Sequence, residues 1–127
     1  MKKRIYYHDT DAGGVVYYAN YLKYLEEART EYLIERGLTI EYLKQERFLY
    51  AVRKCSLVYK APARYGDMIV IDAQLQKITA AQIMFKQSVI DAATSKLLVE
   101  ADVTLVSLDY DFKPAPIPEQ IRQALLS

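Results

Sequence analysis

Two acids and two glycines stand close together near the start of the chain, in the stretch HDTDAGGVVYYAN at residues 8–20. Asp9 and Asp11 supply carboxylates, which can attack a carbonyl carbon or remove a proton from water. Gly13 and Gly14 can adopt backbone conformations that larger residues cannot, and they let another molecule approach the backbone closely. A simple turn needs at most one or two of these residues. The stretch is therefore a candidate reaction site.

A helical pattern begins directly after this stretch. Apolar and aromatic residues, Leu22 among them, recur on one side at helical spacing over residues 18–36, and Gly37 ends the pattern. The first turn of a helix has backbone N–H groups without partners and a partial positive charge. Such donors can stabilise the oxyanion that develops when a carbonyl is attacked. A carboxylate beside them would complete the parts of a hydrolytic site.

Two other interpretations use the same residues. Asp9 and Asp11 can cap the helix or hold a turn, with the glycines forming only the bend. A metal site would use His8 with the two aspartates, but no second cluster of histidine or cysteine supports it. We therefore expect neither a metal nor a cofactor. His8 is the only histidine and no G-x-S-x-G motif is present, which argues against a Ser-His-Asp triad.

The elements that must position this stretch are mostly strands. Apolar and polar residues alternate in MIVIDAQLQKI and LLVEADVTLVSL, as in strands with one buried face. The connectors are short, which suits antiparallel neighbours. The expected elements are a strand at residues 4–7, a helix at 18–36, a short helix or turn at 39–44, strands at about 47–59, 68–78, 82–90 and 97–108, and closing helical turns at 119–127. This order predicts a single α+β domain over residues 1–127, with one long helix on an antiparallel sheet.

The composition of the chain limits which binding partners and which cellular compartment we expect. The formal net charge is +1, which gives no electrostatic reason to expect nucleic acid or an anionic membrane. No apolar run approaches the ~18 residues of a membrane span, so we expect no membrane insertion. The basic start lacks the apolar core of a signal peptide, and we expect a cytoplasmic protein. Cys55, the only cysteine, cannot form an internal disulfide and is predicted to be a small buried residue.

The segment YYHDTDAGGVVYYANYLKYLEEARTEYL resembles the signature of the hotdog-fold acyl-CoA thioesterases. It is most similar to the YbgC type and to the related 4-hydroxybenzoyl-CoA thioesterases. The core D-x-D-A-G-G-V-V-Y-x-A-N-Y is long and specific, and the similarity continues through VRKCSLVYKAPARYGD and the later strands. The resemblance implies a hotdog fold, in which an antiparallel sheet wraps around one long central helix.

The resemblance also implies roles for individual residues. Asp11, directly before A-G-G, would be the catalytic carboxylate, acting on an acyl-CoA thioester as nucleophile or as general base on water. The backbone N–H of Tyr18 would hold the thioester carbonyl. YbgC-type proteins usually carry a histidine at the position of Tyr18, whereas the hydroxybenzoyl branch carries tyrosine. Family members are homodimers or dimers of dimers, so a homotetramer with acyl-CoA bound between subunits is expected.

Further substrate contacts are expected around the acidic stretch and in the basic segment after the helix. Tyr7 would orient Asp11 or line the pocket, and cations near the P-A-R-x-G-D turn would meet the CoA phosphates. The predicted substrate-binding residues are Tyr7, Gly14, Val15, Arg53, Lys54 and Arg64. Within the helix, Arg29 lies on the apolar side with Glu26 three residues before it, which predicts a structural ion pair.

Two other functions stay open at this point. A catalytically weak hotdog protein could bind acyl thioesters or an acyl carrier protein, and the tyrosine at position 18 is compatible with that. A hydratase or dehydratase needs a histidine at the substrate, and the only histidine, His8, lies at the end of the expected first strand.

Overall fold

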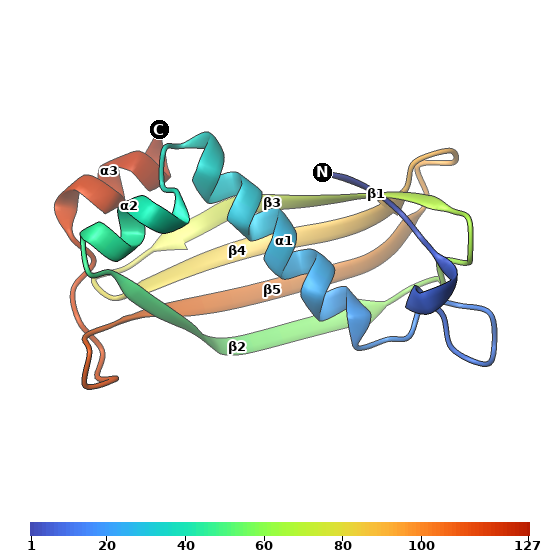
Figure 1. The fold of residues 1–127 in the computed structure, drawn as a ribbon, viewed down its shortest axis with the longest axis horizontal. Coiled ribbons are helices and arrows are strands. Elements are labelled where there is room, and N and C mark those ends of the chain that lie inside the picture. The colour runs from blue at the N-terminus through green and yellow to red at the C-terminus, as the bar shows by residue number, and fades with distance from the viewer.

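The computed structural model describes residues 1–127 and contains a five-stranded antiparallel sheet in the order β1-β3-β4-β5-β2 (Figure 1). Three α-helices of 16, 6 and 8 residues accompany the sheet. In chain order the elements are β1 (Lys2–Arg4), the 3-10 helix η1 (Tyr7–Asp9), α1 (Asn20–Glu35), α2 (Ile40–Gln45), β2 (Leu49–Tyr59), β3 (Met68–Ile78), β4 (Gln82–Asp91), β5 (Leu97–Leu108) and α3 (Glu119–Leu126). The predicted α+β class and antiparallel sheet are confirmed.

The central strands bury one face, as their alternation predicts. In β5, Val99, Ala101, Val103 and Leu105 are each at most 3% exposed, whereas Glu100 on the opposite face is exposed. Burial of a large aliphatic side chain contributes about 1.5–3 kcal/mol. The apolar face of the sheet must therefore be covered.

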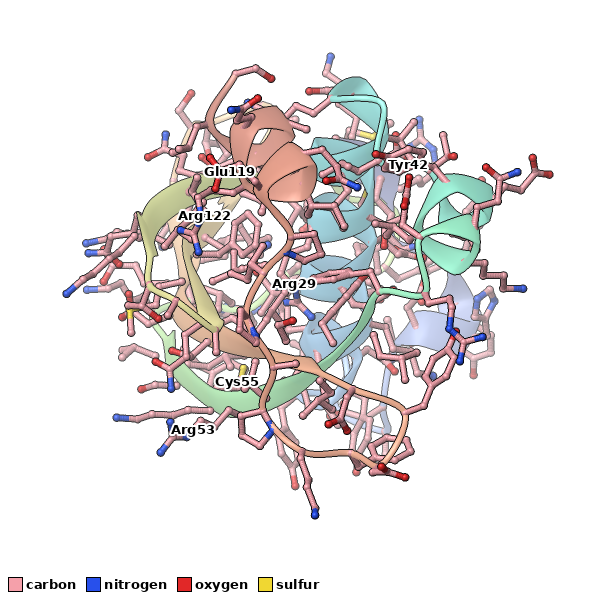
Figure 2. The ribbon with its side chains drawn as sticks, turned by 90° about the vertical axis from the view of Figure 1, so that its left-hand side faces the viewer. Arg29, Tyr42, Arg53, Cys55, Glu119 and Arg122 are labelled. Atoms are coloured by element: carbon pink, nitrogen blue, oxygen red, sulfur yellow. The ribbon has the colours of Figure 1, made fainter.

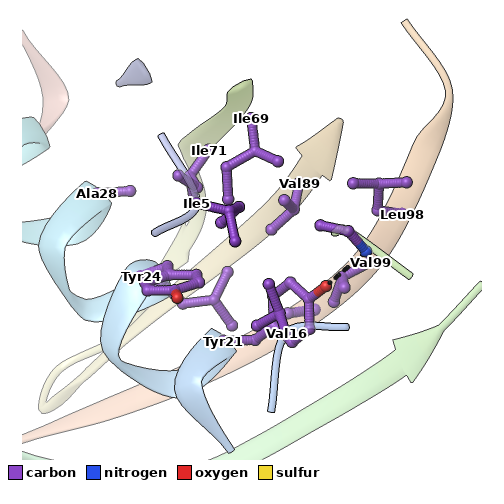
Figure 3. Close-up of a cluster of buried hydrophobic side chains, with 13 residues drawn as sticks. Ile5, Val16, Tyr21, Tyr24, Ala28, Ile69, Ile71, Val89, Leu98 and Val99 are labelled. Atoms are coloured by element: carbon purple, nitrogen blue, oxygen red, sulfur yellow. Dashed lines mark hydrogen bonds between the residues drawn. The ribbon is translucent and has the colours of Figure 1, made fainter. Parts of the chain in front are cut away.

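Helix α1 supplies this cover by lying across the sheet (Figure 1). Its Tyr21, Tyr24, Leu25 and Ala28 form one apolar cluster with residues of the sheet (Figure 3). The C-terminal half of α1 packs into a second cluster, to which α2 and α3 also contribute. Gly37, with a φ of 78°, ends this part of the chain with a left-handed residue, as expected from glycine after a helix.

Arg29 is buried between α1 and the sheet, but it does not form the predicted ion pair with Glu26. Its Nη1 donates instead to Oε1 of Gln87 at 3.0 Å. The Gln87 amide nitrogen in turn donates to the carbonyls of Leu25 and Asp72 at 3.0 and 3.1 Å. The correction follows from burial, because Arg29 is 7% exposed and faces β4, whereas Glu26 is exposed.

The first strand is displaced from the predicted residues 4–7. Strand β1 covers Lys2–Arg4, and Tyr7–Asp9 forms a 3-10 helix. The Asp9 carboxylate accepts the N–H of Tyr6 at 2.8 Å, and this local hydrogen bond competes with sheet pairing. His8 therefore lies in the 3-10 turn rather than in a strand.

The prediction that Cys55 is buried is wrong, since Cys55 is exposed. Strand β2 is an edge strand that pairs only with β5, while α1 packs mainly over β3. Leu22, placed by helical spacing on the apolar side of the helix, is likewise 47% exposed. Both residues are exposed because they lie along the strip between α1 and β2 that the helix does not cover, which we call the open strip.

The Arg29–Gln87 hydrogen bond generates a stability prediction. Gln87→Ala leaves a buried guanidinium without this acceptor, and we expect the free energy of unfolding to fall by about 2 kcal/mol. Urea denaturation should show a lower midpoint with an unchanged slope. The matched variant Gln76→Ala, at an exposed position of β3, should unfold like the wild type. Equal midpoints for the two variants would contradict this account.

Candidate active site

Residues 10–16 form a closed loop between η1 and α1. Its ends pair through a bridge of Thr10 with Val16, and the Asp11 N–H donates to the carbonyl of Val15 at 2.9 Å. The loop is also attached to the segment after β2. The Val16 N–H donates to the Ala63 carbonyl at 2.9 Å, and Val15 bridges to Arg64. These bonds hold Asp11 on a fixed backbone.

The Asp11 side chain is exposed to solvent on this loop. Its Oδ1 accepts the N–H of Gly13 at 2.8 Å, and the other carboxylate oxygen accepts no hydrogen bond within the chain. A Cβ at position 13 would lie 3.2 Å from Oδ1, so a side chain there would crowd the carboxylate and glycine does not. Gly14 has a φ of 78° and allows the Asp11 carbonyl to accept its N–H at 3.0 Å.

The segment before α1 carries free backbone donors. The helix begins at Asn20, two residues later than the sequence predicts, and the N–H groups of Tyr18 and Ala19 donate no hydrogen bond within the chain. The Tyr18 carbonyl accepts the hydroxyl of Tyr59 at 3.2 Å, which ties this segment to the end of β2. A helix start with unused N–H groups can accommodate a negatively charged oxygen.

Asp9 connects the loop to the helix. Its backbone carbonyl accepts the Tyr17 N–H and the Asn20 side-chain amide, both at 3.0 Å. The Tyr24 hydroxyl donates to Asp9 Oδ1 at 2.8 Å. Burial raises the pKa of Tyr24, and the adjacent Asp9 carboxylate raises it further, so the phenol stays a neutral donor.

An open cavity of roughly 310 Å³ adjoins the start of α1. Aromatic and aliphatic side chains form most of its wall, and Val16 connects it to the Asp11 loop. The lining residues are Val16, Tyr18, Tyr21, Tyr59, Lys60, Ala61 and Pro62. The Tyr21 hydroxyl accepts the Ala63 N–H at 3.3 Å, and burial raises the pKa of this phenol (Figure 3). Such a wall suits an apolar group.

The structure divides the predicted substrate-binding residues among three places. Gly14, Val15 and Arg64 lie in or against the Asp11 loop. Tyr7 is 76% exposed, and its ring packs against that of Tyr65 with centroids 5.8 Å apart.

Arg53 lies elsewhere, on the face of the sheet turned away from α1 (Figure 2). Lys54 pairs with Thr104 of β5 and lies beside Arg53. They border a shallow hollow with Gln82, Met84 and Thr104. The structure does not bring these two cations to the Tyr18 cavity.

Tyr21 and Tyr59 form the cavity wall but were not singled out from the sequence. Tyr21 belongs to the predicted apolar side of the helix, where core packing is the ordinary role of an aromatic residue. Tyr59 ends a strand that is remote in sequence. Only the fold brings the two rings within 5.8 Å of each other.

No three histidine, cysteine, aspartate or glutamate side chains are grouped so that they could hold a metal ion. None of the helices combines the length and apolar character needed to cross a membrane.

The chain matches the family model described as the thioesterase-like superfamily over residues 6–125. Among curated proteins, it is 40% identical over 119 residues to the acyl-CoA thioester hydrolase YbgC of Escherichia coli O157:H7, covering 93% of this chain and 88% of the relative. It is 34% identical over 123 residues to the acyl-CoA thioesterase YbgC of Haemophilus influenzae, covering 95% and 89% of the two chains.

Solved structures agree on the fold. The hypothetical protein TT1821 of Thermus thermophilus superposes with a TM-score of 0.91 at 28% identity, covering 99% of this chain and 95% of the other. A 1,4-dihydroxy-2-naphthoyl-CoA thioesterase of Synechocystis also gives 0.91, at 24% identity and with 100% and 94% coverage.

The sheet order, the helix across it and these superpositions define a hotdog fold. The chain belongs to the thioesterase-like superfamily, and its curated relatives make it an enzyme that hydrolyses thioesters.

Gly14 provides a test of the loop geometry. Gly14→Ala places a Cβ on a left-handed residue, and we expect the free energy of unfolding to fall by about 1–2 kcal/mol. Gly13→Ala, whose backbone lies outside that region, should lose less stability and act on the Asp11 carboxylate instead. Urea denaturation of both variants checks the order, and a larger loss for Gly13→Ala would contradict it.

Proposed function

We propose that this protein hydrolyses acyl-CoA thioesters to the free acid and CoA, using the Asp11 carboxylate and the Tyr18 backbone N–H. The observation that carries the proposal is the position of these two groups beside each other in the chain and next to an apolar cavity. A carboxylate with a free oxygen sits on a fixed loop, and the loop leads into a helix start with unused N–H groups beside an apolar cavity. The proposal is supported by the names of the YbgC relatives, which are acyl-CoA thioesterases.

This chemistry needs few groups. In hydrolysis the oxygen of water forms a bond to the thioester carbonyl carbon, the C–S bond breaks, and the thiolate leaves. A thiol has a pKa of about 8.5, so the leaving thiolate needs less protonation than an amine or an alkoxide would. The Tyr18 N–H stabilises the oxyanion of the intermediate.

Asp11 acts either as a general base, taking a proton from water, or as a nucleophile. In the second case it forms a mixed anhydride with the acyl group, which water then hydrolyses. Both routes give the same products.

The cavity beside Tyr18 receives the acyl group, because its wall is mostly aromatic and aliphatic. Lys60 lines the same cavity, and Arg64 pairs with Val15 of the loop. Both positions support a role for these cations in binding the CoA phosphates. Arg53 lies on the opposite face of the sheet with Lys54 beside it, and we assign these two residues no contact with a substrate bound to the same chain.

The functional form is a homo-oligomer built on the free edge of β2. This strand has 11 residues and pairs on one side only, which leaves backbone N–H and C=O groups available to a second copy. The adjoining strip is apolar, since Val52 is 51% and Leu22 47% exposed. Two-fold pairing of β2 strands would extend the sheet and cover this strip. Within each subunit, α1 serves as the central helix of the hotdog fold.

Replacement of the carboxylate tests the reaction. Asp11→Asn should lower kcat for thiol release at least about 10²-fold, because an amide can neither accept the proton nor attack the carbonyl. The measurement is thiol release from short, long and aromatic acyl-CoAs. The matched variant Asp111→Asn changes an exposed aspartate in the loop after β5 and should retain wild-type rates.

Equal rates for wild type and Asp11→Asn would remove Asp11 from its role. If the wild type releases no thiol from any substrate but binds acyl thioesters or an acyl carrier protein, the protein is a binding module instead.

A charge on the open strip tests the oligomer. Val52→Glu would bury a carboxylate in the proposed interface, and we expect the dissociation constant of the dimer to rise at least about tenfold. Sedimentation velocity over a concentration series measures this. The control Ile40→Glu alters an exposed apolar residue of α2 and should leave assembly unchanged. Unaltered assembly of Val52→Glu would reject the β2 edge as the interface.

A further inference from the structure

Asp9 is a buried acid that the proposed reaction does not use. The residue is 7% exposed, and a carboxylate at such a place needs hydrogen-bond donors to offset the hydration it has lost. Two donors reach it. The Tyr6 N–H lies 2.8 Å from Oδ2, and the Tyr24 hydroxyl lies 2.8 Å from Oδ1. His8 is more distant, with Nε2 3.7 Å from Oδ1 and an exposed side chain.

The backbone of the same residue holds the other half of the site. Its carbonyl accepts the Tyr17 N–H and the Asn20 side chain, each at 3.0 Å. Tyr17 and Asn20 flank Tyr18, whose N–H is the proposed oxyanion donor. Asp9 itself precedes Asp11 by two residues. One residue therefore connects the backbone of the carboxylate to the backbone of the donor.

Tyr24 determines how firmly this connection is held. It lies one turn into α1, it is 3% exposed, and its ring packs edge-on against Tyr21 with centroids 5.8 Å apart. Because this packing holds the ring, its hydroxyl is a hydrogen-bond donor at a fixed position for the Asp9 carboxylate. The hydrogen bond thus ties the 3-10 turn to the body of the helix.

We propose that Asp9 and Tyr24 are positioning residues, which hold Asp11 and the Tyr18 N–H at the separation that the reaction requires. This inference rests on the proposed function, because it concerns the same two groups. The loop at residues 10–16 keeps its own hydrogen bonds without Tyr24, so loss of the hydroxyl shifts the loop relative to α1 and leaves its internal form unchanged.

The arrangement predicts a selective effect on kcat. The cavity wall comes largely from Tyr21, Tyr59 and residues 60–62, none of which is hydrogen-bonded to Asp9, so substrate affinity should change little. A small displacement of reacting groups, by contrast, can cost up to about 10²-fold in rate. We expect Tyr24→Phe to lower kcat about 10- to 100-fold and to leave KM within about threefold.

The matched control is Tyr32→Phe. This variant also removes one tyrosine hydroxyl from α1, where it donates to the Leu125 carbonyl at 2.9 Å at the other end of the helix. It should lose similar stability and keep wild-type kcat. Steady-state kinetics with the acyl-CoA that the wild type hydrolyses best, together with urea denaturation, compare the two variants.

A double-mutant cycle identifies the route of the effect. If Tyr24 acts through Asp9, the variant carrying Tyr24→Phe and Asp9→Asn together should lose no more kcat than Asp9→Asn alone. Additive losses would show that Tyr24 acts by packing and would overturn the proposal. Wild-type kcat in Tyr24→Phe, or an equal loss in Tyr32→Phe, would overturn it as well.

The proposed function and this inference fail separately. If Asp11→Asn retains wild-type activity, the reaction itself is assigned to the wrong residue. If Asp11→Asn is inactive and Tyr24→Phe is unaffected, only the positioning role is lost.

Discussion

Helix α1 covers the apolar face of the sheet, and most other features of the molecule follow from how far that cover extends. The helix packs chiefly over β3 and leaves the edge strand β2 with an open strip. Its C-terminal end meets α2 and α3 in the second apolar cluster, while its N-terminal end meets the loop that carries Asp11 (Figure 1). One packing arrangement therefore supplies the core, an unpaired edge and a helix start at the candidate site.

The candidate site depends on hydrogen bonds between segments rather than on the loop alone. Residues 10–16 are closed by their own backbone bonds, but their position relative to α1 is set by Asp9, through its carbonyl and its carboxylate. The segment directly before the helix contributes the free N–H groups, because those of Tyr18 and Ala19 donate no hydrogen bond within the chain. The hydrogen bonds that Asp9 makes to both segments, more than any unusual residue, distinguish this site from an ordinary connection into a helix.

The sequence allowed much of the fold to be predicted because burial has a simple period in each element. Two strands were predicted with the observed bounds, since Met68–Ile78 and Leu97–Leu108 alternate apolar and polar residues along their length. The first strand was misplaced because the Asp9 carboxylate accepts the Tyr6 N–H and turns the chain where the local pattern favours extension. Cys55 and Leu22 were misjudged because periodicity marks an apolar side but does not show how far the covering helix reaches.

The sequence by itself determined the α+β class, and it identified Asp11, Gly14 and the start of a helix as one candidate site. Both depend on the order of residues within short segments, where spacing translates directly into local structure. The thioesterase family was indicated by the resemblance of its motifs to a known signature. Only the tertiary structure decided which side chains meet across long separations. It set Tyr59 against the start of α1, paired Arg29 with Gln87 and placed Arg53 on the far face of the sheet. Such contacts depend on strand order and helix placement, which the sum of many weak packing interactions fixes and no local pattern contains.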